Sequence, residues 1–73
     1  MSEKKQIMAD MVKDLALLLM QQQPELSMDQ ALSIVFNSDT YQKVLDERTT
    51  FYYQSPGYVF SFLDAEMKTG KMG

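Results

Sequence analysis

The chain contains neither cysteine nor histidine, and this absence limits its possible folds more than any residue that it contains. With 73 residues, it buries only about 60% of the surface that it exposes when unfolded, so its own core is thin. Chains of this size commonly supplement such a core with disulfides, a metal site or a partner subunit. Disulfides and the usual transition-metal ligands are excluded here, which leaves association with another chain. We therefore expect one domain over residues 1–73 that binds no metal and no cofactor.

Charge and hydropathy narrow the range of partners and locations. Seven basic against ten acidic residues give a net charge of −3, which disfavours nucleic acid as a partner. Lys4 and Lys5 precede an apolar stretch as in a signal peptide, but Asp10 interrupts that stretch and no small-residue cleavage site follows. No uncharged run approaches the ~18 residues of a membrane span. These features predict a cytoplasmic protein without a membrane segment.

One long helix is predicted before Pro24. Apolar residues recur at helical spacing over residues 3–22 and share one face, at Ile7, Met8, Met11, Val12, Leu15, Leu18 and Leu19. Leu17 and Met20 fall outside this face, so the helix carries more apolar surface than one small core uses. Pro24 ends the pattern because the residue before a proline is pushed out of the α region.

Two shorter helices are predicted next. Ser27 and Gln30 have the spacing of a capping box, which predicts a helix over residues 28–36. Ser38 or Asp39 caps a third helix. Residues 49–53 are β-branched or aromatic and by propensity favour a strand, but they continue the helical period of the residues before them. We therefore expect the third helix to span residues 39–52.

A fourth helix completes the predicted fold. Ser55 and Pro56 form a strong helix start, which predicts a helix over residues 56–68. Links of two to five residues join the four helices, so neighbours in sequence pack against each other. The predicted fold class is all-α: a compact four-helix orthogonal or irregular bundle without a sheet.

No pattern of catalytic residues is found. Without histidine or cysteine, the remaining candidates are carboxylates, hydroxyls, lysines and tyrosines. Asp64 and Glu66 are two residues apart on a predicted helix and point about 200° away from each other. Asp46 and Glu47 are also poorly placed as a pair. We interpret all four as solvated helix surface and predict that the chain is not an enzyme.

Two charged residues depart from that pattern. Arg48 lies within the apolar stripe of the third predicted helix, and Glu66 lies between Val59 and Phe62 on the fourth. Charges seldom face a core without a partner. A recognition site is one interpretation, and side chains that extend to water are another. We favour a structural ion pair between Arg48 and Glu66 at the edge of the core.

The apolar surplus predicts a protein-interaction module. Seven of the eight aromatic residues lie after Asn37, and a core of large rings explains most of them. Tyr53 and Phe60 fall off the core stripes, as Leu17 and Met20 do on the first helix. Exposed aromatic and methionine side chains are typical of protein interfaces. These four residues are the predicted contacts of a homo-oligomer or of a protein partner.

The alternative function is a DNA-binding or antitoxin-like regulator. The second and third predicted helices, with Asn37 and Ser38 between them, have the length and short link of a helix-turn-helix. Residues 25–48 contain five acids and two bases, a net charge of −3 where phosphate contact needs positive charge. Protein interaction is therefore the favoured function.

Residues 52–66 also carry a resemblance to known proteins. The Tyr53-Gln54-Ser55 turn, followed by Tyr58-Val59 and Leu63, resembles a family of short uncharacterised bacterial helical proteins. Members of that family often carry a histidine just before the turn, where this chain has tyrosines. The resemblance implies a small cytosolic bacterial protein partnered with another gene product, such as a toxin, and it transfers no site residue.

Overall fold

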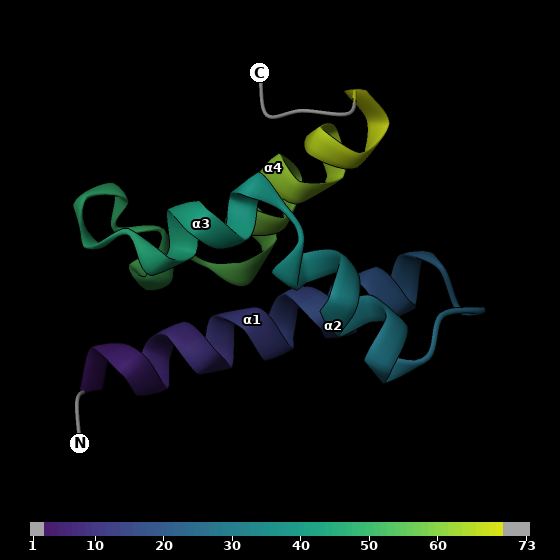
Figure 1. Cartoon of the computed structure of the whole chain (residues 1–73), viewed down its shortest axis with the longest axis horizontal. Coiled ribbons are helices and arrows are strands. Elements are labelled where there is room, and N and C mark those ends of the chain that lie inside the picture. Colours follow the sequence, from purple (N-terminus) through teal and green to yellow (C-terminus); the bar gives the residue numbers. More distant parts are fainter. Residues whose placement is uncertain (1–2, 70–73) are drawn as a thin grey trace.

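Four α-helices and two short 3₁₀ turns make up the described part of the chain, residues 3–69, in a computed structural model (Figure 1). Their bounds are α1 Glu3–Gln22, α2 Met28–Phe36, α3 Asp39–Leu45, η1 Glu47–Thr49, η2 Phe51–Tyr53 and α4 Pro56–Thr69. No strand occurs between residues 3 and 69, so the predicted all-α bundle is confirmed. The predicted bounds of the first two helices agree with the structure, whereas those of the third do not. None of the described helices is long and apolar enough to cross a membrane.

The helix α1 is the element against which the others pack. It contacts α2, α3, α4 and η2, and Figure 1 shows it running along one edge of the molecule with α2 beside its C-terminal half. Its core-facing residues recur at helical spacing, at Met11, Val12, Leu15, Ala16 and Leu19. Ala31 and Val35 from α2, Val44 from α3, and Val59 and Leu63 from α4 are fully buried with them. The core is therefore shared by all four helices.

The start of α2 is set by the predicted capping box. The hydroxyl of Ser27 accepts a hydrogen bond from the backbone N–H of Gln30 at 3.2 Å. The side-chain oxygen of Gln30 accepts one from the backbone N–H of Ser27 at 2.9 Å. Two N–H groups that a helix start otherwise leaves unpaired are thus satisfied within four residues of sequence.

The third helix ends at Leu45, so the prediction that it continues to residue 52 was wrong. The backbone of Asp46 is extended, and its carboxylate accepts a hydrogen bond from the N–H of Arg48. Asp46 thereby caps the start of η1. The hydroxyl of Thr49 donates to the carbonyl oxygens of Lys43 and Asp46. These side chains bond the backbone groups that a continuing helix would use. Helical period alone therefore overestimated the length of α3.

Residues 50–53 reverse the chain between α3 and α4. Thr50 has a φ of 55°, the left-handed region that a β-branched residue seldom adopts. The turn η2 follows and directs Tyr52 into the core, where it is 5% exposed, while Tyr53 is 64% exposed. The hydroxyl of Ser55 then accepts the N–H of Tyr58 and caps α4 as predicted.

Candidate functional site

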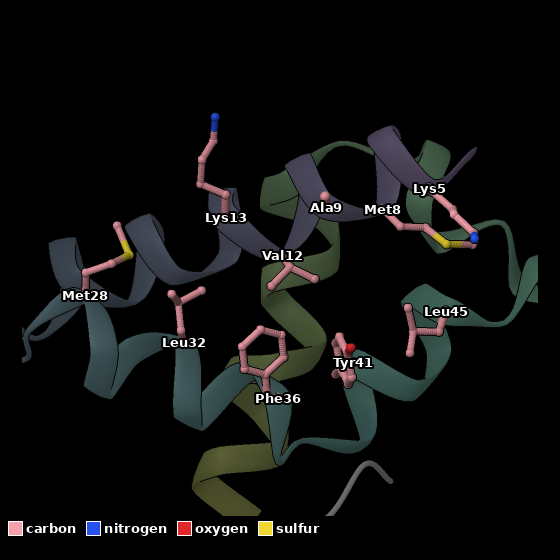
Figure 2. Close-up of a pocket in the computed structure, with 10 residues that line it drawn as sticks. All are labelled: Lys5, Met8, Ala9, Val12, Lys13, Met28, Leu32, Phe36, Tyr41 and Leu45. Carbon is pink, nitrogen blue, oxygen red and sulfur yellow. The ribbon is translucent and has the colours of Figure 1, made fainter. Parts of the chain in front are cut away.

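An open groove lies between α1, α2 and α3 (Figure 2). Its volume is about 530 Å³. Most of the residues that line it are apolar; the full set is Lys5, Met8, Ala9, Val12, Lys13, Met28, Leu32, Phe36, Tyr41 and Leu45. We call this feature the apolar groove.

The wall contributed by α2 follows directly from its sequence. Met28, Leu32 and Phe36 are four residues apart, and side chains at that spacing lie above one another on one face of a helix. The core-facing pair Ala31 and Val35 lies on an adjacent face, and both are fully buried. The helix α2 therefore has more apolar surface than the core covers. The surplus face becomes a wall of the apolar groove.

The opposite wall and one end come from α1 and α3. Figure 2 shows Met28 at one end of the apolar groove and Met8 with Leu45 at the other. The rings of Phe36 and Tyr41 meet edge to face between these ends, with centroids 5.2 Å apart at an interplanar angle of 82°. This contact joins α2 and α3 across the short link at residues 37–38. Phe36 nevertheless remains 49% exposed and Leu45 42% exposed.

The charge around the apolar groove is positive, although the whole chain is acidic. Lys5 and Lys13 are the only charged residues among those that line it. Both side chains belong to exposed residues, and neither forms an ion pair within residues 3–69. In Figure 2 the ammonium of Lys5 lies near Met8 at one end, and that of Lys13 points from α1 away from Leu32 and Phe36. The apolar groove therefore has two uncompensated cations at its α1 side.

A second hollow, most of whose lining residues are charged, continues from the Lys5 end and is lined partly by residues 46–48. There Lys4 forms an ion pair with Glu47 at 3.1 Å, and this hydrogen-bonded contact raises the pKa of the Lys4 ammonium. The guanidinium of Arg48 and its backbone N–H both donate to Asp46, which lowers the pKa of that carboxyl. These charges compensate one another within the hollow. Lys5 also lines this hollow and has no ionic partner among residues 3–69.

The predicted ion pair between Arg48 and Glu66 was wrong. Arg48 pairs with Asp46 at 3.1 Å, and its side chain is 91% exposed. The carboxylate of Glu66 instead accepts the N–H groups of Asp39 and Thr40 at 2.6 and 2.9 Å, and the hydroxyl of Thr40 at 2.8 Å. Because α3 ends at Leu45, Arg48 never joins the face of α3 that meets α4. Glu66 is thus a structural residue that holds the start of α3 against α4.

The four predicted partner contacts do not gather at the apolar groove. Leu17 is 41% exposed on α1, and Tyr53 is 64% exposed at η2. Met20 and Phe60 are partly buried and pack against the core, which reduces the surface that they offer to a partner. None of the four lines the apolar groove. They remain candidates for contact outside it.

A second group of aromatic residues covers the junction of η2 with α4. The ring centroids of Phe51 and Phe62 are 5.1 Å apart, and those of Tyr58 and Phe62 are 5.2 Å apart. Tyr58 is 50% exposed, so the cluster reaches the surface. Packing of rings against one another accounts for much of the aromatic content of the second half. This cluster was predicted as part of the core, but it lies at the edge of the core.

Sequence analysis predicted the helix that carries Met28, Leu32 and Phe36, but not the apolar groove that they line. A signal was present, because six of the nine residues of α2 are apolar and they surround more than one face. One short helix in a small bundle cannot bury that much surface against its neighbours.

The described residues contain no group of three or more histidines, cysteines or carboxylates that could hold a metal ion. Comparison of the chain with protein-family models, with curated proteins and with solved structures gave no match. Its function therefore has to be inferred from the geometry of its surface.

Proposed function

We propose that this chain is a small, non-catalytic protein-interaction module and that the apolar groove is its binding surface. One observation carries the proposal: Phe36 and Leu45 stay about half exposed on the same apolar groove in a chain whose core is thin. Apolar residues scattered singly over a surface are ordinary, whereas a gathered apolar patch is typical of an interaction site. Cover by a second protein removes this surface from water and stabilises the complex.

The setting in this proposal is the bacterial cytoplasm, with either a second copy of the chain or another gene product as partner. The resemblance of residues 52–66 to short bacterial helical proteins supports it. Exposed Leu17 and Tyr53 supply further apolar contact area outside the apolar groove. A larger partner contacts both regions, whereas a short helical segment contacts only the apolar groove.

Site-specific photo-crosslinking in the source cells tests the proposal. A photoreactive phenylalanine analogue at Phe36 is expected to give a discrete adduct with a protein or with a second copy of the chain. The matched control places the analogue at Lys43, an exposed residue of α3 that does not line the apolar groove. No adduct from position 36, together with a monomer in sedimentation from micromolar to millimolar concentration, contradicts the proposal.

The geometry of α3 gives the helix-turn-helix alternative no support. The first N–H groups of α3 are already bonded to the carboxylate of Glu66, which repels a phosphate. Asp39 and Lys43 are the charged residues of its seven, so α3 has no net charge with which to meet DNA. We expect no binding of duplex DNA at low salt. Binding that Lys43→Ala abolishes would favour the alternative instead.

A further inference from the structure

We infer that the occupant of the apolar groove is an acidic amphipathic helix of another protein, whose acids face Lys5 and Lys13. The inference rests on the proposed function and specifies the chemistry of the partner. It depends on three features: the open shape of the apolar groove, the residues that form its two ends, and the charge of its lining.

The shape favours a helix over a small ligand. The apolar groove is open along its length and is walled by three helices. An amphipathic helix laid into such a groove buries a stripe of apolar side chains at helical spacing. A small molecule is normally enclosed on most sides by its pocket. Met8 and Met28 lie at the two ends, and the flexible methionine side chain adapts to the residues of a docked helix.

The charge favours an acidic partner. Both charged residues of the lining are lysines without ion pairs in the described chain. Lys4, Arg48 and Lys68 have acidic partners, and Lys43, which does not line the apolar groove, is the one other unpaired cation of residues 3–69. Lys5 and Lys13 are eight residues apart, which separates them by about 12 Å along α1. Acids about two turns apart on a docked helix match that distance. One carboxylate of a fatty acid would compensate only one of the two lysines.

The charge also disfavours a symmetric pairing of two copies through their apolar grooves. Lys5 and Lys13 of both copies would then lie in one interface, where like charges repel. A partner with acids beside its apolar stripe meets no such repulsion.

Titration calorimetry with two designed peptides tests the inference on the full chain. Each peptide has about 18 residues, or about 27 Å of helix, with leucines repeating every three or four positions. One carries glutamates beside the leucines, and its twin carries lysines at the same positions. The glutamate peptide is expected to bind at least about tenfold more tightly than its twin at low salt, with the difference shrinking as salt screens the charges.

Charge reversal locates the effect. The double variant Lys5→Glu, Lys13→Glu is expected to lose the preference for the glutamate peptide or to invert it. The double variant Lys43→Glu, Lys68→Glu changes the net charge equally at residues that do not line the apolar groove, and it keeps the preference. Circular dichroism confirms that both variants fold.

Two outcomes overturn the inference while leaving the proposed function intact. Equal binding of both peptides shows that the apolar groove does not select acids. Self-association that Phe36→Ser abolishes makes a second copy the occupant. Binding of decanoate without binding of either peptide assigns the apolar groove to an anionic lipid and overturns the proposed function as well. The proposed function also fails if position 36 gives no crosslink in cells and the chain sediments as a monomer.

Discussion

The helices α2 and α3 are neighbours in sequence and similar in length, yet different parts of the chain satisfy their first N–H groups. In α2 the donors and acceptors come from Ser27 and Gln30, three residues apart. In α3 the hydroxyl of Ser38 accepts the N–H of Tyr41 locally, but the first two N–H groups, those of Asp39 and Thr40, donate to Glu66 from α4. The start of α2 is thus a local structure, whereas α3 depends on the docking of α4. A seven-residue helix has little stability of its own, so this dependence matters.

The largest effect is expected when the link between α3 and α4 is removed. Glu66→Ala leaves the N–H and hydroxyl of Thr40, a fully buried residue, without their acceptor. Bonds to a charged group contribute about 1.5–3 kcal/mol, so we expect a loss of unfolding free energy in that range. Urea denaturation followed by circular dichroism measures it.

The matched control for that variant is Glu66→Gln. Its amide oxygen can still accept from Thr40, so a smaller loss is expected. Hydrogen exchange adds a spatial readout, because Glu66→Ala should speed exchange in both α3 and α4. Stability equal to that of the unaltered chain would show that α3 forms independently of α4.

A smaller and more confined effect is expected at the start of α2. Ser27→Ala removes the hydroxyl that accepts the N–H of Gln30, and loss of such a cap costs about 1 kcal/mol. Faster hydrogen exchange should stay within α2, unlike the response to Glu66→Ala. Ser33→Ala is the control, since Ser33 is an exposed residue in the middle of the same helix. An equal loss in both serine variants would argue that propensity, and not the cap, determines the stability of α2.

The same contrast explains which features could be predicted from the sequence. The bounds of α2 follow from Ser27 and Gln30, whose chemistry is complete within four residues. The partners of Glu66 lie 26 and 27 residues away, and no local pattern indicates them. The predicted ion pair with Arg48 depended on a third helix that was too long. Once Asp46 and Thr49 end α3, that geometry is lost.

The position of the apolar groove was not predicted for a related reason. Periodicity identified Met28, Leu32 and Phe36 as apolar residues of α2, but it does not say which faces of a helix the neighbours cover. That depends on the direction in which α3 leaves the link at residues 37–38. In the structure this direction brings Tyr41 against Phe36 and leaves one face of α2 open.

The segment after α3 offers a variant that should increase stability. Thr50 adopts a φ of 55°, which a β-branched residue occupies at a cost and glycine occupies freely. Thr50→Gly removes this cost but also increases the entropy of the unfolded chain, which partly cancels the gain. The net rise in the unfolding free energy is expected to be about 0.5–1 kcal/mol, and urea denaturation measures it. Thr50→Asn should give an intermediate gain, because asparagine tolerates this region. A loss of stability in both variants would show that this turn needs its threonine side chain.

The smallest effect is expected at Arg48, which tests directly whether the chain beyond α3 takes part in the α3–α4 link. Its side chain is 91% exposed and bonds only to Asp46 among the described residues, so Arg48→Met should lower the urea midpoint at neutral pH only slightly. The loss in the double variant with Glu66→Gln should equal the sum of the two single losses, since the two sites share no contact. A pH series refines the test. Arg48 lowers the pKa of Asp46 in the folded chain, so its contribution is present above the ordinary pKa of an aspartate and is lost as the pH falls through the folded value. The small loss in Arg48→Met should therefore disappear at acidic pH. A double-variant loss at neutral pH that differs from the sum of the single losses would instead support the ion pair that the sequence predicted.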